Sequence, residues 1–237
     1  MDAISAEHSL KVVALGGGLL ILWAIICLKI KNWTPGLLTT FYILIALTTV
    51  LSTAYLAFST INLNVTSSSG GPVHWHADFE IWNCGTEVNL KDPTGAWSNK
   101  IGTATLHEHN DKRIHLEGVV VERTDASLGR FFQVVGGEIN SQFAIVPTNE
   151  GPLKLINGQS CNGKPAALQV FAYRVTGKNY RQEKVANPES FIIAPQSQVP
   201  SGDCIIVEFD NPKSKTDKLC RSYQVAKQIG KLGAEVP

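Results

Sequence analysis

The sequence lacks the short motifs by which familiar enzyme classes are identified. It contains no nucleophile elbow, no phosphate-binding loop, no dinucleotide fingerprint and no H-E-x-x-H pattern. It also contains no C-x-x-C, which argues against a zinc ribbon and against a thioredoxin type of redox site. Internal repeats and long low-complexity segments are absent too, so we expect one composite globular domain rather than a repeat protein.

Charged residues are missing from two long stretches, Val12–Leu28 and Gly36–Ile61. Each stretch is long enough to cross ~30 Å of hydrocarbon as a helix. We therefore expect a transmembrane hairpin with spans at about residues 12–28 and 37–59, in contact with the lipid bilayer. The absence of charge inside the spans argues against a transport or proton pathway. The net charge of the whole chain is only +1, which gives no support for nucleic acid as a partner.

A cleaved signal peptide is the alternative interpretation of the first span. Its start is not strongly basic, because Asp2 and Glu7 precede Lys11, and no A-x-A site occurs before Lys29. We therefore expect both spans to be retained. Lys29 and Lys31 lie in the connection between the spans, so the positive-inside rule places that connection in the cytoplasm. Both termini and the main domain would then lie on the extracytoplasmic side of the cell membrane.

Small and hydroxylated residues in both spans would permit close packing of helices. This packing could serve the hairpin itself or a membrane-protein partner. The residues are Gly16, Gly17 and Gly18 in the first span and Thr48, Thr49, Ser52, Thr53 and Ala54 in the second.

After the spans, the small and polar residues 62–71 are expected to form a flexible tether to a β-rich domain at residues 72–237. The expected fold class is α+β. A division of the domain near residues 146–152 is the alternative to a single unit. Alternating apolar residues and turn residues predict strands at Val73–Asn83, Glu87–Leu90, Thr103–His109, Ile114–Arg123, Leu153–Ile156, Ala167–Val175, Ser190–Ala194 and Cys204–Phe209.

Two segments of the domain have helical spacing instead. Thr124–Val135 is predicted to be a short mid-domain helix, with Asp125 as its N-cap and Gly136-Gly137 as its stop. Thr216–Leu232 is predicted to be a C-terminal amphipathic helix with a basic outer face. That face is expected to be solvated, with anionic lipid or a partner protein as the alternative contact.

The domain contains an even number of cysteines, namely Cys84, Cys161, Cys204 and Cys220. An even number in an extracytoplasmic domain indicates disulfides, and four cysteines allow three pairings. We favour Cys204–Cys220, because this bond would attach the last helix to the last strand. Free buried thiols are the alternative.

Five of the six histidines lie between residues 74 and 115. Two H-x-H pairs, His74/His76 and His107/His109, precede His115. On a strand, alternate side chains share a face, so each pair would project to one side. On the first strand that face would also carry Asp78 and Glu80, and such a face is costly to bury unless its groups are paired or bind a cation.

The hairpin after the second pair decides whether His115 joins the cluster. A three-residue loop at residues 111–113 would pair His109 with His115 and His107 with Glu117, with all four side chains on one face. A two-residue loop would send His115 and Glu117 to the opposite face.

We therefore predict a metal site formed by His74, His76, His107, His109 and His115, with copper or zinc as the ion. Three ligands and a water would make a catalytic site, and four ligands a structural one. Candidates for outer partners that orient the rings are Asp78, Glu80, Glu108 and Glu117. A hydrogen-bonded structural network and scattered surface histidines are the alternatives.

His74, His76 and Glu80 match the H-x-H-x-x-x-E core of the first cupin motif, although the flanking glycines and a second motif are missing. A closer resemblance, over residues 73–132, is to a family of uncharacterised membrane-anchored or secreted prokaryotic proteins. Where its relatives often have aspartate directly after the second H-x-H, this chain has Asn110 before Asp111. The matching residues are His74, His76, Ala77, Asp78, Phe79 and Ile81; Ile101 and Gly102; Leu106, His107, His109 and Asp111; Ile114, His115 and Glu117; and Ser127, Leu128, Gly129, Phe131 and Phe132.

This resemblance implies that the histidines act as one unit, but it implies no activity. Three classes of function follow from the sequence. The first is an extracytoplasmic module for metal binding, delivery or sensing. The second is a metal-dependent enzyme in which Glu108 or Glu117 is the base. The third is an assembly subunit of a membrane complex, with structural histidines.

Overall fold

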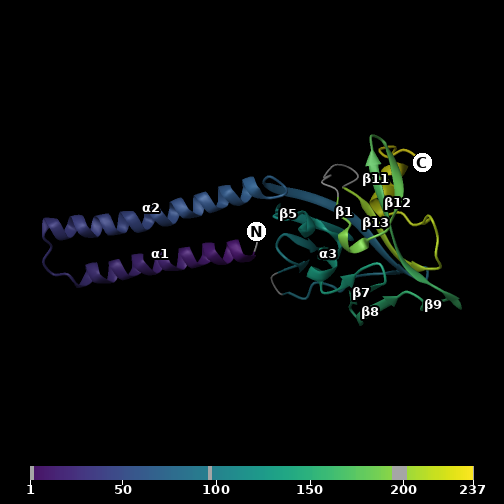
Figure 1. Ribbon diagram of the computed structural model, residues 1–237, viewed down its shortest axis with the longest axis horizontal. Coiled ribbons are helices and arrows are strands. Elements are labelled where there is room, and N and C mark those ends of the chain that lie inside the picture. The colour runs from purple at the N-terminus through teal and green to yellow at the C-terminus, as the bar shows by residue number, and fades with distance from the viewer. Residues whose placement is uncertain (1–2, 96–97, 194–201, 237) are drawn as a thin grey trace. The chain divides into compact units, whose positions relative to one another are not determined.

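The computed structural model describes residues 3–95, 98–193 and 202–236 (Figure 1). The chain divides into two compact units, Met1–Gly71 and Pro72–Pro237, which are described separately. The first unit is helical and the second is built mainly from strands, so the fold is α+β as predicted.

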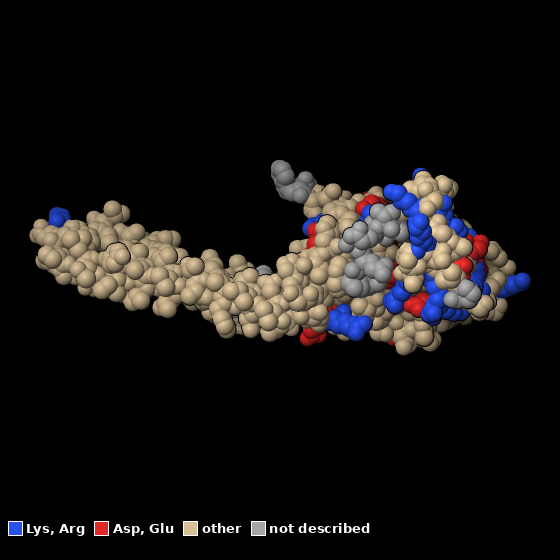
Figure 2. Space-filling model, turned by 90° about the horizontal axis from the view of Figure 1, so that it is seen from above, with Lys and Arg blue, Asp and Glu red and all other residues tan. Residues whose placement is uncertain are grey.

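The first unit is a hairpin of two long helices, α1 (Ala3–Lys29) and α2 (Pro35–Thr66). Both are long and apolar enough to cross a membrane. α2 begins with Thr34 as N-cap, whose hydroxyl accepts a hydrogen bond from the Leu37 N–H at 3.3 Å. Because α2 continues to Thr66, the first half of the expected tether is helical. Figure 2 shows charged side chains gathered on the β-rich domain, whereas the helices are almost free of them on this face.

The two helices approach each other closely at one glycine. A Cβ atom on Gly16 would lie 2.5 Å from Ser52 Oγ and 3.4 Å from Ser52 Cβ, so the Ser52 hydroxyl would have to turn away to admit a larger residue. Gly17 and Gly18 face open space. Beyond the glycine contact, Trp23 of α1 packs edge-to-face on Phe41 of α2, with ring centroids 6.2 Å apart.

The second unit contains thirteen strands and four helical segments within its described residues. The strands are β1 (Pro72–Asn83), β2 (Thr86–Val88), β3 (Ile101–Gly102), β4 (Leu106–Glu108), β5 (Arg113–Val119), β6 (Glu138–Ile139), β7 (Phe143–Thr148), β8 (Gly151–Ile156), β9 (Ser160–Cys161), β10 (Lys164–Pro165), β11 (Ala167–Thr176), β12 (Asn179–Val185) and β13 (Cys204–Asp210). The helical segments are the 3-10 helices η1 (Arg123–Ala126) and η2 (Pro188–Ser190) and the α-helices α3 (Leu128–Val135) and α4 (Arg221–Gln228).

The main sheet has the order β12-β11-β13-β1-β5-β4-β3, and β2 also pairs with β1. β1 is its central strand: it runs parallel to β13 on one side and antiparallel to β5 on the other. β6, β7 and β8 form a separate three-stranded sheet. Residues 146–152, the alternative point of division, lie in the β7–β8 hairpin, and buried residues before and after this hairpin share one core.

Each face of the main sheet has its own apolar layer. On one face, α3 and the β7–β8 hairpin cover apolar side chains that include Phe79, Ile114 and Leu116. On the opposite face, α4 packs Tyr223 and Ala226 against β11 and β13. The histidines of β1, β5 and β4 belong to this second face, because each alternates with a residue of the first layer.

Both predicted helices in the domain are shorter than expected. The mid-domain helix begins at Leu128, with Ser127 as N-cap, while Asp125 instead forms a capping box in the preceding 3-10 turn. Gly136 ends this helix in the left-handed region, as predicted. α4 covers only Arg221–Gln228, and Ile229, which follows it, is 59% exposed.

The disulfides are Cys84–Cys161 and Cys204–Cys220, so the favoured pairing is confirmed. The second bond joins β13 to the residue that precedes α4. The strand predicted at Ser190–Ala194 is wrong over its described residues: Ser190 ends η2, and Ile192 makes only an isolated bridge with Ser127. Ala194 lies outside the described residues.

Candidate metal centre

The three strands β1, β5 and β4 are neighbours in the sheet, and each contributes histidines to the same face. β1 carries His74 and His76, which pair in register with Glu117 and His115 of β5. β5 in turn pairs His115 with His107 of β4. His115 therefore lies on the middle strand, between the two H-x-H pairs.

The hairpin register differs from both alternatives that the sequence allowed, but the histidine face is kept. His107 pairs with His115 rather than with Glu117, a shift of two residues. A shift of two preserves the side-chain alternation, so His107 and His115 still project together. The connection spans residues 109–112, with Asn110 and Lys112 at positive φ.

The longer connection is held by a side chain of β4. Glu108 Oε1 accepts hydrogen bonds from the backbone N–H groups of Asp111 at 2.6 Å and Lys112 at 3.1 Å. Because Glu108 is buried, these bonds satisfy one of its oxygens and fix the turn.

The five imidazole rings form one continuous group. Ring centroids are 4.6 Å apart for His74 and His76, and 4.8 Å apart for His76 and His115. On the other side of His115, the centroids of His107 and His109 lie at 5.4 Å and 4.9 Å. His107 and His109 are themselves 4.8 Å apart.

Two sets of three rings bring one nitrogen each close enough together to hold a metal ion. They are His74, His76 and His115, and His107, His109 and His115, with the ligand atoms of each set within 4.8 Å of one another. Ligands at a zinc–nitrogen distance of about 2.1 Å lie roughly 3.4 Å apart in a tetrahedron, so the spacing of either set is compatible with three of the four ligands of such a site.

Two imidazole nitrogens are buried without a hydrogen-bond partner among the described residues. They are Nδ1 of His76 and Nδ1 of His107, one in each set. Burial lowers the pKa of His107 from 6.5 to about 4, and the charge of Lys100 is the next cause. Burial also lowers the pKa of His76, and the positive charges of His115 and His74 add to this effect. Both rings are therefore neutral at pH 7, which is the form that binds metals.

Carboxylates hold two of the remaining rings. Glu117 Oε1 lies 3.2 Å from Nε2 of His74, and Asp111 Oδ2 lies 3.1 Å from Nε2 of His115. Asp111 was not among the predicted outer partners, although its position four residues before His115 across a tight turn is the signal that could have identified it. The carbonyl oxygen of Asn99, also not predicted, lies 3.2 Å from Nδ1 of His109.

Asp78 and Glu80, two predicted outer partners, mainly anchor α4. Asp78 forms an ion pair with Arg113 Nε at 2.6 Å and accepts a hydrogen bond from the Ser222 hydroxyl of α4. Glu80 Oε1 accepts a hydrogen bond from the Arg221 N–H at 3.1 Å. Asp78 still acts on the cluster electrostatically, because its charge raises the pKa of His76 against the larger effect of burial.

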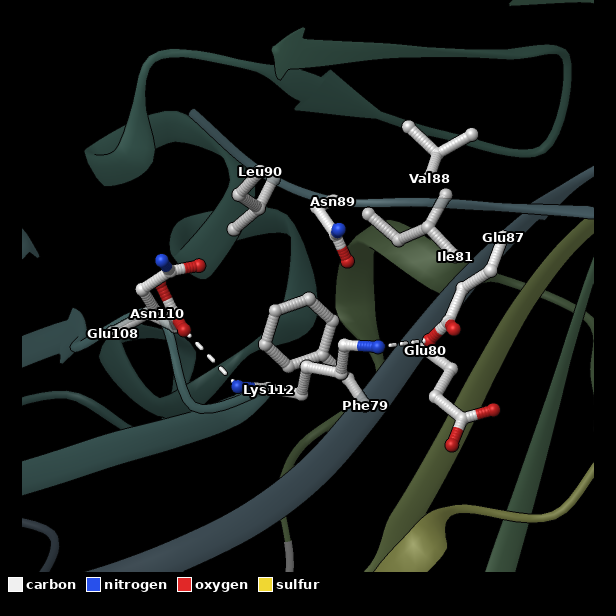
Figure 3. A pocket seen from close by; sticks show the side chains of 10 residues that line it. All are labelled: Phe79, Glu80, Ile81, Glu87, Val88, Asn89, Leu90, Glu108, Asn110 and Lys112. Carbon is white, nitrogen blue, oxygen red and sulfur yellow. Dashed lines mark hydrogen bonds and ion pairs between the residues drawn. The ribbon is translucent and has the colours of Figure 1, made fainter. Parts of the chain in front are cut away.

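Glu108 lies on the opposite face of β4 from His107, because adjacent strand residues alternate. Figure 3 shows it beside a small pocket that Phe79 and Leu90 also line, with its carboxylate directed to the Lys112 backbone. In the same view the Lys112 ammonium reaches Glu87 at 2.5 Å. This position does not suit Glu108 for the role of base at the histidines.

Comparisons with protein-family models, with curated proteins and with solved structures found no match to this chain. The function must therefore be inferred from the geometry of the site.

Proposed function

We propose that this is a membrane-anchored extracytoplasmic protein whose sheet binds a copper or zinc ion through imidazoles, for metal binding, delivery or sensing. The observation that carries the proposal is the pair of buried, unpartnered Nδ1 atoms of His76 and His107, counted over the described residues, within a cluster of five imidazoles.

A hydrogen-bonded structural network is the main rival, and these two atoms argue against it. Such a network would satisfy its buried nitrogens, because each unpaired polar group costs about 1–3 kcal/mol. A metal ion would use the same nitrogens as ligands. Its binding would also be stronger because both rings are already neutral, so no proton has to be displaced from His76 or His107 at pH 7.

The carboxylates around the cluster fit the same proposal. Metal-binding histidines commonly donate their second ring N–H to a carboxylate or a carbonyl, which orients the ring and raises its basicity. Asp111 on His115, Glu117 on His74 and the carbonyl of Asn99 on His109 supply three such contacts. All five rings offer nitrogen ligands, a set that suits both copper and zinc.

The cellular location in this proposal rests on three observations. Two apolar helices precede the domain, two disulfides within it are typical of an oxidising compartment, and the lysines of the helix connection favour a cytoplasmic side for that connection. Fusing a reporter active only outside the cytoplasm to the C-terminus tests this topology. Activity of a cytoplasm-specific reporter at the same position would contradict it.

The metal proposal is tested on the full chain in mild detergent. After chelation and dialysis, we expect the protein to bind added Zn²⁺ or Cu²⁺, measured by calorimetry and by metal content. His115→Ala removes a ligand from both sets. Loss of outer partners alone typically weakens metal binding 10–100-fold, so this variant should lose about 100-fold or more.

His8→Ala is the matched control, because His8 is the sixth histidine and lies on α1, outside the cluster. It should bind metal like the wild type. Near-ultraviolet circular dichroism verifies that each variant is folded. Folded wild-type protein that binds neither ion, or a His115→Ala variant with unchanged affinity, would refute the proposal.

A further inference from the structure

The two sets of metal-ligand candidates overlap in a single residue. His115 is a member of both, and the sheet order explains why: β5 lies between β1, which carries His74 and His76, and β4, which carries His107. A side chain on the middle strand is the one that can reach both neighbours. The cluster is therefore two triads with a common ligand rather than five equivalent rings.

Only one ring nitrogen of His115 is available as a metal ligand. Its Nε2 lies 3.1 Å from Asp111 Oδ2. A carboxylate oxygen accepts hydrogen bonds, so we assign the ring proton of His115 to Nε2. The proton on Nε2 leaves Nδ1 as the available ligand. A single nitrogen lone pair binds a single ion, so the two triads cannot be occupied together while Asp111 keeps this contact.

The triads also differ in their access to solvent. In the triad of β1, the side chain of His74 is 66% exposed. In the triad of β4, His107 is only 1% exposed. Each triad contains one of the two Nδ1 atoms that have no partner among the described residues, that of His76 in the triad of β1 and that of His107 in the triad of β4.

Resting on the metal-binding function proposed above, we infer that the cluster binds one ion at a time and passes it between an outer and an inner triad that share His115. The ion is captured by His74, His76 and His115. It then exchanges its bonds to His74 and His76 for bonds to His107 and His109 while His115 keeps hold of it. Two metal–nitrogen bonds break and two form, and no electron or proton is transferred. This is the arrangement of a protein that takes up and delivers an ion rather than storing it permanently.

Metal stoichiometry tests the inference without any variant. The full chain in detergent should bind one Zn²⁺ per chain at saturation, measured by metal content and by calorimetry. Two ions per chain would overturn the inference, because His115 would then bridge them through both nitrogens. A wild-type chain that binds no ion would refute the metal function itself, which is a different outcome.

Two double variants separate the triads. The outer variant His74→Ala/His76→Ala and the inner variant His107→Ala/His109→Ala should each still bind one ion, whereas His115→Ala should lose about 100-fold or more in affinity. If either double variant lost as much as His115→Ala, the rings would act as a single site and the inference would fall.

Exchange rates provide the directional test. Transfer of Zn²⁺ to a chromogenic chelator is followed by stopped-flow absorbance. The outer variant should take up and release the ion more slowly than the wild type, because the exposed entry ligands are gone. The inner variant should release it faster. Equal rates in both variants would contradict passage from one triad to the other.

Discussion

Histidine 107 should make the metal-free protein sensitive to mild acid. Its imidazole is 1% exposed, and burial, followed by the charge of Lys100, lowers its pKa from 6.5 to about 4. A histidine whose pKa is depressed on folding favours the folded state while it is neutral. That contribution is complete above pH 6.5 and is lost as the pH falls toward 4, because the unfolded chain then binds a proton that the folded chain does not.

The size of the effect follows from the two pKa values. A depression from 6.5 to about 4 corresponds to a loss of about 2 kcal/mol in the free energy of unfolding between pH 7 and pH 5. By pH 4 the loss reaches about 3 kcal/mol. For a chain of this size, about 2 kcal/mol is a fall of roughly 4–8 °C in melting temperature.

The assay compares the wild type with His107→Gln in chelator-treated buffer, from pH 7 to pH 5. Denaturant unfolding of the domain is followed by tryptophan fluorescence. Only the slope against pH is compared, so a constant packing effect of the substitution cancels. The variant should lack about 2 kcal/mol of the wild-type pH dependence. Lys100→Gln should show a smaller reduction, because burial is the larger cause of the shift. Parallel curves for wild type and His107→Gln would refute the reasoning.

Other consequences of the structure can be measured independently. Zinc at about 100 times its dissociation constant should stabilise the folded domain by about 2.7 kcal/mol, reversed by chelation; a melting temperature unchanged by zinc would contradict this. Replacing Cys204 and Cys220 by alanine opens a loop with a sequence separation of 16, which should cost about 3 kcal/mol in denaturant unfolding. Gly16→Val should widen the distance between spin labels on the two helices, because its side chain would meet Ser52, whereas Gly17→Val should leave that distance unchanged.

Much of the fold could be predicted, because the spacing of apolar residues and the composition of each segment indicate its secondary structure. The strand at Val73–Asn83 was recognisable from alternation and appears as β1 at Pro72–Asn83. The strand β12 was missed, since Asn179–Val185 is mostly polar and lies at the edge of the sheet, where it pairs with β11. β12 is held by backbone hydrogen bonds to β11, which nearly any residue type can make, so this strand has no hydrophobic pattern in the sequence.

The histidine face could be predicted, but the register could not. The sequence allowed two loop lengths, and the observed connection is longer than either because the Glu108 side chain binds two backbone N–H groups within it. Such a side-chain-to-backbone contact has no periodic signature. The contacts of two predicted outer partners could not be predicted for a related reason: Asp78 and Glu80 share a face with His76, but they also bind residues of α4 that are more than a hundred residues away in the sequence.

The contrast between the two faces of the same three strands argues against a merely structural role for the histidines. On one face, Leu106, Ile114 and Leu116 form a fully buried apolar layer. On the other face the same strands carry His76, His107 and His115, and two of these rings bury a nitrogen that has no partner in the described parts of the chain. Burying such groups destabilises the fold, whereas apolar side chains of similar volume would be neutral or stabilising. If stability were the only requirement, apolar side chains would occupy both faces of these strands. The neutral rings of His76 and His107, on the two strands that flank β5, each bury a nitrogen without a described partner. A ligand that uses such lone pairs explains them, and a metal ion is the ligand that takes several at once.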